Sequence, residues 1–278
     1  MKKLLKLLIC SSLVISLFGC GQSNNLEQKE DNSLAKIQQK GQLVIGTSAD
    51  YAPREFHMVI DGKDTIVGYD IDIAKEIAKD MGVELKIQDI SFEGLLTSLN
   101  AGQVDMVIAG MAVTPERLEA VDFSIPYGKS TDLSEGQKLV IRKEDKDLYT
   151  SIESLANKNV AVQKSGLQEQ IAKKQLSNSK ITYLSKIPML VLELQSKKVD
   201  AIILASDVAK NYANENPDLY VTDIPLVQEI EGTAIAFKKG SNALVEQTNS
   251  TLQRLMSDGT MDEIIEKNEK IVEDLNKK

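Results

Sequence analysis

The segment AGMAVTPERLEAVDFSIPYG, residues 109–128, contains Arg117, a side chain whose type suits the binding of a planar anion. Arginine is rare in this chain, where most cations are lysine. The four arginines are Arg54, Arg117, Arg142 and Arg254. A guanidinium holds a carboxylate or phosphate through two parallel hydrogen bonds, whereas an ammonium offers a point charge. The sequence therefore raises the question of which anion Arg117 binds.

The residues just before Arg117 have the types that begin a helix. Thr114 is a good N-cap and Pro115 suits the first helical position. An anion beside Arg117 would then also meet free backbone N–H groups and the positive end of the helix. The alternative is a surface ion pair between Arg117 and Glu116 or Glu119, an interaction that rarely requires arginine.

The sequence lacks the residue sets of common hydrolases and zinc sites. It has one histidine, His57, and two cysteines, Cys10 and Cys20. His57 lies in EFHMVIDGKD, which is typical of a hairpin closed by Asp61-Gly62, so we expect a solvated histidine there. No GxSxG, Walker A or GxGxxG pattern occurs, and the acids lack EF-hand spacing, although a site of scattered carboxylates stays possible. We therefore expect no catalytic residue, no cofactor and no metal.

The N-terminus is typical of an export signal that ends in a lipidation site. Residues 1–19 are predicted to be a lipoprotein signal peptide, because they have a basic start and an apolar run and end at the Gly19-Cys20 junction. Residues 20–32 are predicted to be a polar tether. Cys20 is the predicted lipidated residue, which would anchor the protein to the outer face of the cell membrane, as in Gram-positive bacteria. An ordinary signal peptide with a stray cysteine is the alternative.

The charge of the chain argues against nucleic acid as a partner. The full sequence has 33 basic and 41 acidic residues, and loss of Lys2, Lys3 and Lys6 with the signal peptide leaves a net charge of −11. Phosphate backbones require a basic face. With Cys10 removed and Cys20 lipidated, no disulfide can form, so stability must come from the core.

Strand and helix patterns alternate along the first part of the chain. Buried strands are predicted over residues 43–48 and 104–110, with an alternating strand over 83–88. Helices are predicted over residues 69–82, with Asp70 and Asp72 at its beginning, and over 91–102, with Ser91 as the N-cap.

A second block repeats this alternation. Strands are predicted over residues 138–143, 159–166, 180–184 and 199–206, and helices are predicted to begin near Ser151, Leu167, Pro188 and Ser206. Two further helices, 244–257 and 260–268, follow at the C-terminus. LLTSLNAGQVDMVIAG resembles LVLELQSKKVDAIILA, with Asp105 matching Asp200. The patterns predict two similar α/β lobes with largely parallel sheets and a cleft at the carboxyl ends of the strands.

The chain resembles the amino-acid-type (family 3) extracellular solute-binding proteins through motifs that fall in the family's order: TSADYAPREF, GYDIDIAKEIAKDM, VDFSIPY, VAVQKSGLQE and DGTMDEIIEKN. The resemblance covers nearly all of the chain after the signal peptide. It implies a periplasmic-binding-protein fold. Lobe I would comprise 33–127 plus 232–278, lobe II would comprise 130–226, and hinges would lie near 126–130 and 227–232.

The resemblance also implies roles for individual residues. Arg117 matches the arginine that clamps the ligand α-carboxylate, and Ala112 would add its backbone N–H. Tyr51 and Phe92 match two aromatics that sandwich the ligand side chain, although core aromatics are the bland alternative. The loop before Leu167 would supply N–H groups on closure. The candidate ligand-binding residues are Ser48, Tyr51, Phe92, Gly110, Ala112, Arg117, Gln163, Ser165, Gly166, Leu167, Ala205 and Asp207.

Three residues depart from the family pattern. Ser48 stands where many relatives have aspartate, and Arg54 stands where an apolar aromatic is common. Ala205 stands where the acidic partner of the ligand α-ammonium is expected, and Asp207 is the nearest replacement. These departures leave the ligand side chain open.

The expected function is that of a monomeric, lipid-anchored substrate-binding protein that captures a polar amino acid by hinge closure and delivers it to an ABC permease and ATPase. Two alternatives stay open. One is a non-transporting sensor or adhesive lipoprotein, and the other is a dehydratase- or transglycosylase-like enzyme on the same fold.

Overall fold

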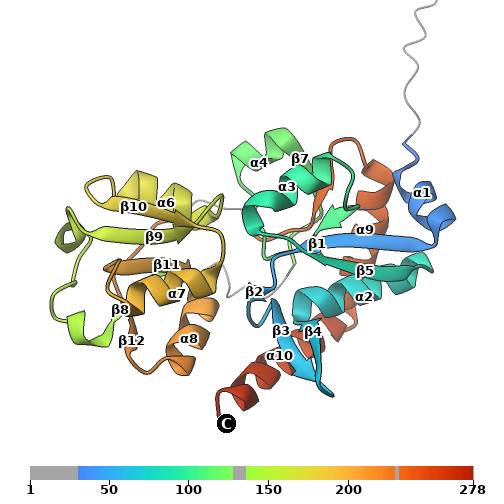
Figure 1. The fold of residues 1–278 in the computed structure, drawn as a ribbon. Coiled ribbons are helices and arrows are strands. Elements are labelled where there is room, and N and C mark those ends of the chain that lie inside the picture. The colour runs from blue at the N-terminus through green and yellow to red at the C-terminus, as the bar shows by residue number, and fades with distance from the viewer. Residues whose placement is uncertain (1–30, 128–135, 229–231, 278) are drawn as a thin grey trace, which may run out of the picture. The chain divides into compact units, whose positions relative to one another are not determined.

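The computed structural model describes residues 31–127, 136–228 and 232–277, which form two α/β lobes (Figure 1). The predicted signal peptide, the lipidation site Cys20 and parts of both predicted hinges lie outside these ranges. The predicted boundaries of the domains therefore stay a prediction.

The first lobe is built on a five-stranded sheet with the order β5-β1-β6-β13-β7. Its strands are β1 (Gln42–Thr47), β5 (Glu84–Asp89), β6 (Met106–Val107), β7 (Val121–Phe123) and β13 (Ala236–Lys238). Its helices are α1 (Ser33–Lys40), α2 (Tyr69–Met81), α3 (Phe92–Asn100), α4 (Pro115–Ala120), α9 (Asn242–Ser257) and α10 (Thr260–Leu275). A small three-stranded sheet, made by β2 (Asp50–Tyr51), β3 (Glu55–Ile60) and β4 (Lys63–Val67), belongs to this lobe.

The second lobe repeats this plan with the order β10-β9-β11-β8-β12. Its strands are β8 (Gln137–Arg142), β9 (Asn159–Gln163), β10 (Lys180–Leu184), β11 (Ala201–Ala205) and β12 (Leu219–Val221). Its helices are α6 (Leu167–Gln175), α7 (Ile187–Gln195) and α8 (Ser206–Glu215), with short 3-10 turns η1 (Lys143–Asp145) and η2 (Glu153–Leu155).

Four of the five strands in each sheet run in the same direction, as the sequence patterns predicted, and one strand is antiparallel to its neighbours. In the first sheet β1 runs parallel to β5 and β6, and β13 runs antiparallel to β6 and β7. The second sheet has the same pattern, with β8 as its antiparallel strand. β8 and β13 each follow a crossing between the lobes. Such a strand enters its sheet at the carboxyl ends of the parallel strands, so it runs the opposite way.

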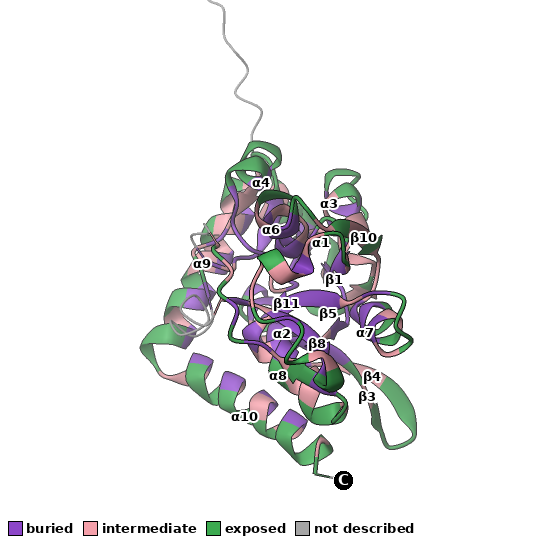
Figure 2. Ribbon diagram, turned by 90° about the vertical axis from the view of Figure 1, so that its left-hand side faces the viewer, coloured by how far each residue is buried: buried purple, intermediate pink, exposed green. Residues whose placement is uncertain are grey.

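Apolar side chains cover both faces of each sheet, and the buried residues in Figure 2 follow the strands and the inward faces of the helices. In β1, Leu43 and Ile45 pack under α2, α9 and α10, while Val44 between them packs on the opposite side with residues of α3. Because successive side chains of a strand point to opposite faces of the sheet, β1 contributes to two hydrophobic cores. No helix formed by the described residues combines the length and apolar composition that crossing a membrane requires.

The repeated sequence that contains Asp105 and Asp200 forms the same pair of hydrogen bonds in both lobes. Asp105 donates its N–H to the carbonyl of Val44 (2.7 Å) and accepts from the Val44 N–H through its carboxylate (2.8 Å). Asp200 makes the same two contacts with Asn159, at 2.7 and 2.9 Å. Each aspartate ties the beginning of one strand to the chain that enters its neighbour.

Several predicted elements need correction. The strand predicted over residues 104–110 is formed only by Met106–Val107, and the chain turns at Gly110, which has φ +52°. The helix predicted near Ser151 is only the 3-10 turn η2. Ser91 precedes α3 but makes no side-chain cap hydrogen bond. The last helix continues beyond residue 268 to Leu275 because its apolar face continues.

Candidate functional site

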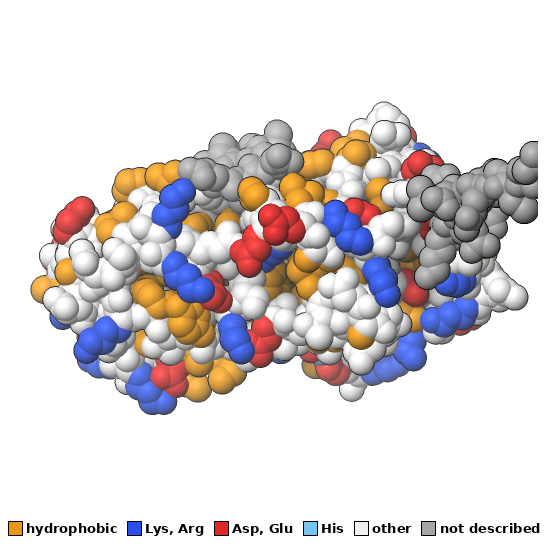
Figure 3. All heavy atoms as spheres, turned by 90° about the horizontal axis from the view of Figure 1, so that it is seen from above, with side chains coloured by type: hydrophobic (Ala, Val, Ile, Leu, Met, Phe, Trp, Pro, Cys, Tyr) orange, Lys and Arg blue, Asp and Glu red, His pale blue; other side chains and the backbone are white. Residues whose placement is uncertain are grey.

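A cavity of about 220 Å³ lies between the two lobes, at the carboxyl ends of the parallel strands. The first lobe contributes residues from the segments after β1 and β6, and the second lobe contributes residues after β9 and β11. Of the predicted ligand-binding residues, those that line the cavity are Ser48, Tyr51, Phe92, Gly110, Ala112, Arg117, Gln163, Leu167, Ala205 and Asp207. Acidic and basic side chains are interspersed over the face of the molecule seen in Figure 3.

Arg117 reaches the cavity from the first turn of α4. The hydroxyl of Thr114 accepts from the Arg117 N–H (3.3 Å) and Pro115 opens the helix, which confirms the predicted cap. The Arg117 side chain is only 7% exposed, and its guanidinium donates to the carbonyls of Ala112 (2.7 Å) and Ser165 (2.9 Å).

No carboxylate of the described residues forms an ion pair with Arg117. The surface-pair alternative with Glu116 or Glu119 is therefore wrong for the described structure. Its guanidinium lies 5.4 Å from the centre of the Phe92 ring. Burial lowers the pKa of Arg117 to about 10, so the group stays charged at neutral pH. A buried cation without an anion favours binding of one.

The second-lobe loop after β9 is placed differently from the prediction. Ser165 and Gly166 line a second cavity, which Arg117 also lines, and not the cavity between the lobes. The Ser165 N–H donates to the Glu169 carboxylate (2.7 Å), and the Gly166 N–H donates to the Gln163 carbonyl (3.2 Å). Both N–H groups are thus already used within the lobe, and it is the Ser165 carbonyl that contacts Arg117.

Asp207 brings a carboxylate into the cavity close to Ala205. It lies in the first turn of α8, its side chain is 30% exposed, and one oxygen is 3.4 Å from Nε of Arg54. Arg54 belongs to the first lobe and is 4% exposed. Arg54, which departs from the family pattern, therefore meets Asp207, the nearest replacement for the acid expected at Ala205, in an ion pair across the cavity.

A chain of neutral amides, which sequence reasoning missed, forms part of the second-lobe wall. Gln168 donates to Gln137 (2.8 Å), and Gln137 donates to Gln228 (3.3 Å). Burial raises the pKa of the Tyr51 hydroxyl, and the hydrogen bond with Gln168 opposes this shift. No local pattern distinguishes these glutamines from surface glutamines, because their role depends on the facing lobe.

Two buried acids support the floor of the cavity. Asp70 accepts from the N–H of Gly110 (2.8 Å) and from the hydroxyl of Tyr127 (2.7 Å), so this signature residue positions the cavity without lining it. It lies in the first turn of α2, as predicted. Glu55 is 1% exposed and lines the cavity. Burial, reinforced by the charge of Asp70, raises the pKa of Glu55 well above its usual value.

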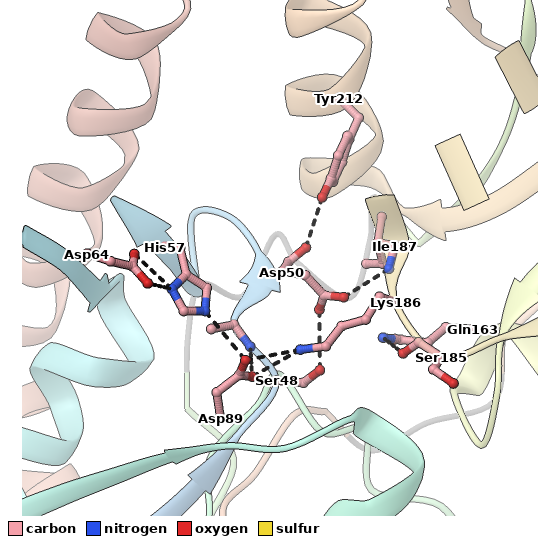
Figure 4. A network of polar contacts seen from close by, with 11 residues as sticks. Ser48, Asp50, His57, Asp64, Asp89, Gln163, Ser185, Lys186, Ile187 and Tyr212 are labelled. Carbon is pink, nitrogen blue, oxygen red and sulfur yellow. Dashed lines mark hydrogen bonds and ion pairs between the residues drawn. The ribbon is translucent and has the colours of Figure 1, made fainter. Parts of the chain in front are cut away.

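Direct contacts join the lobes beside the cavity (Figure 4). The carboxylate of Asp50 accepts from the N–H of Ile187 at the beginning of α7 (2.9 Å), and the hydroxyl of Tyr212 donates to the Asp50 carbonyl (3.2 Å). Lys186 pairs with Asp89 at 3.1 Å.

His57 extends this network on the first lobe. It lies on β3 of the predicted hairpin, and its ring nitrogens contact Asp64 (2.9 Å) and Asp89 (3.4 Å) (Figure 4). Its side chain is 40% exposed, as expected for a solvated histidine. Within the described ranges, no group of three or more His, Cys, Asp or Glu side chains is arranged to hold a metal ion.

Comparison with known proteins identifies relatives along the whole folded part of the chain. Residues 43–269 match the model of the bacterial extracellular solute-binding proteins, family 3. The arginine-binding extracellular protein ArtP of Bacillus subtilis is 36% identical over 271 residues, which cover 96% of this chain and 98% of ArtP. The ABC transporter glutamine-binding protein GlnH of Bacillus subtilis is 34% identical over 277 residues, which cover 96% of this chain and 97% of GlnH.

A solved structure is similar as well. The amino acid ABC transporter substrate-binding protein AbpA of Streptococcus pneumoniae, bound to L-arginine, is 39% identical, with a TM-score of 0.80. The match covers 86% of this chain and 98% of that structure. These similarities confirm the resemblance and the two-lobed fold class predicted from the sequence.

Proposed function

Because the chain belongs to the bacterial extracellular solute-binding proteins of family 3, we propose that it captures a polar amino acid between its lobes and delivers it to an ABC permease and ATPase. The protein would act by binding alone, without catalysis. The named relatives bind arginine or glutamine, so an amino acid is the ligand class that the family supports.

Arg117 is the observation that carries this proposal. Its buried guanidinium lies beside the cavity and has no carboxylate partner among the described residues. The carboxylate of an amino acid would supply the missing charge through a bidentate pair. Asp207 is the proposed partner of the ligand ammonium, in place of the acid expected at Ala205.

Closure of the two lobes would trap the ligand. Arg117 and Asp207 come from opposite lobes, so a ligand that contacts both favours the arrangement in which the lobes are together. The contacts of Asp50 with Ile187 and Tyr212 would add stability to that arrangement.

The test is Arg117→Lys, which keeps the charge and loses the paired donors. We expect at least a tenfold loss of affinity for the amino acid that a thermal-shift screen of the wild type identifies, or about 1.4 kcal/mol. Calorimetry measures this loss. Arg254→Lys is the matched control, because Arg254 is 39% exposed, pairs with Glu76 and Asp80, and lines neither cavity.

Unchanged binding by Arg117→Lys would remove this residue from the site, and a wild type that binds no amino acid would contradict the proposed function. An enzyme would instead convert its bound ligand, which mass spectrometry of the ligand after incubation detects. A wild type that binds an amino acid but does not restore its uptake in a strain lacking its importer's binding protein would favour the sensor.

We also propose that Cys20 anchors the protein as a lipoprotein on the outer face of the membrane. The lipobox-like sequence before Cys20 supports this proposal. Cys20→Ser should move the protein from the membrane fraction to the medium or block its processing. Equal incorporation of labelled fatty acid by the variant and the wild type would contradict it.

A further inference from the structure

We infer that Arg54 selects the ligand side chain: it favours an amino acid whose side chain ends in an oxygen acceptor, such as an amide or a carboxylate, and disfavours a cationic side chain. This inference rests on the proposed function, because it specifies which amino acid the cavity accepts.

Arg54 is built into the wall of the cavity. It follows β2, its side chain is 4% exposed, and its guanidinium lies 5.1 Å from the centre of the Tyr69 ring. Gly110 makes room for it, since a Cβ at Gly110 would lie 2.8 Å from Cδ of Arg54. The ion pair with Asp207, at 3.4 Å, holds the guanidinium toward the second lobe.

Each described carboxylate of the cavity wall already has a hydrogen-bond partner, a cationic partner or a neighbouring acid that favours its neutral form. Asp50 accepts from the Ile187 N–H (2.9 Å) and from the Ser48 hydroxyl (3.3 Å). Glu55 is buried beside Asp70, and burial raises its pKa well above the usual value, which favours its neutral form. Asp207 pairs with Arg54 and is the proposed partner of the ligand ammonium.

A ligand with a cationic side chain would therefore bring a second positive group close to Arg54. Like charges in a partly desolvated cavity repel, and no uncommitted carboxylate in the described wall offsets this repulsion. An amide or carboxylate oxygen would instead accept from a guanidinium. The neutral side chains of Gln137, Gln163 and Gln168 on the facing wall also suit a polar, uncharged or anionic group.

The sequence departures point the same way. The family resemblance led us to expect an aromatic at position 54, aspartate at position 48 and an acid at position 205, whereas this chain has Arg54, Ser48 and Ala205. Each difference removes negative charge or adds positive charge. The preference of this cavity should therefore differ from that of the relative whose structure contains L-arginine.

Calorimetry of the purified full-length protein with L-glutamine, L-glutamate and L-arginine tests the inference. We expect the wild type to bind glutamine or glutamate at least tenfold more tightly than arginine. Arg54→Met keeps the length of the side chain and removes its charge, so it should reduce that ratio at least tenfold. Arg54→Lys retains the charge and should keep most of the discrimination against arginine.

Arg254→Met is the matched control, since it removes an arginine on α9 that lines neither cavity, and it should keep the wild-type ratio. A wild type that prefers arginine, or an unchanged ratio in Arg54→Met, would overturn the inference. The wild-type preference decides by itself if the Arg54 variants do not fold. If the wild type prefers arginine and Arg117→Lys loses binding, only the inference about Arg54 is wrong and the proposed function stands. If the wild type binds no amino acid, the inference and the proposed function are both wrong.

Discussion

At the scale of single residues, burial sets the chemistry of the cavity. Arg117 is charged and buried beside the cavity, and Glu55 is buried next to Asp70. Two nearby acids in a low-dielectric site cannot both ionise without cost, which favours the protonated form of one of them. The raised pKa of Glu55 follows from burial first and from the charge of Asp70 second.

This shift predicts how stability depends on pH. The folded pKa of Glu55 lies above its usual value of 4.5, so the folded state holds the proton more tightly than the unfolded chain. The stabilisation from that proton is complete below pH 4.5 and is lost as the pH rises through the folded pKa. Glu55→Gln should remove this loss, so the variant gains stability relative to the wild type as the pH rises.

Urea unfolding at several pH values measures the effect. Glu266→Gln is the control, because that glutamate is exposed on α10 and should leave the slope unchanged. If the stability of Glu55→Gln declines toward higher pH as steeply as that of the wild type, the decline does not come from Glu55 and the prediction is wrong.

At the scale of elements, an aspartate in each lobe joins two neighbouring strands through hydrogen bonds. The carboxylates of Asp105 and Asp200 accept from the N–H groups of Val44 and Asn159. Alanine would leave the half-buried N–H unsatisfied, at a cost of about 1–3 kcal/mol. Asparagine keeps an acceptor oxygen and should cost less.

We therefore expect the same order of stability, wild type above Asn above Ala, at both positions. Urea denaturation measures it, and Asp147→Ala, an exposed aspartate in the second lobe, should stay within about 0.5 kcal/mol of the wild type. A destabilisation at only one position would mean that the sequence repeat does not carry an equivalent function in the two lobes.

At the scale of the whole folded region, direct hydrogen bonds join the lobes, and under the proposed function they would help to retain the ligand. Tyr212 lines neither cavity, yet its hydroxyl donates to the Asp50 carbonyl of the facing lobe (3.2 Å), while Asn211 donates to Ala52 (2.9 Å). Loss of one such hydrogen bond removes about 0.5–1.5 kcal/mol from the closed arrangement.

Tyr212→Phe should therefore release the ligand roughly two- to tenfold faster, with a smaller change in the association rate. Stopped-flow displacement measures the release. The control is Tyr220→Phe, since Tyr220 lies on β12 and is 38% exposed. An unchanged release rate would show that the contact between the lobes does not contribute to retention.

The sequence by itself determined the features that depend on neighbouring residues. Apolar periodicity located most strands and helices, and the Thr-Pro pair placed Arg117 in the first turn of a helix. The ordered motifs identified the family and, through it, the two-lobed fold and ten of the residues that line the cavity. These signals are readable because capping and periodic burial act within a few residues along the chain.

Only the tertiary structure decided what the two lobes do to each other. It placed Arg54 against Asp207, the Asp50 carboxylate at the beginning of α7, and the Ser165 carbonyl rather than its N–H against Arg117. It also set the antiparallel direction of β8 and β13. These pairings join residues far apart in the sequence, and their geometry depends on how the lobes pack, which no local pattern specifies.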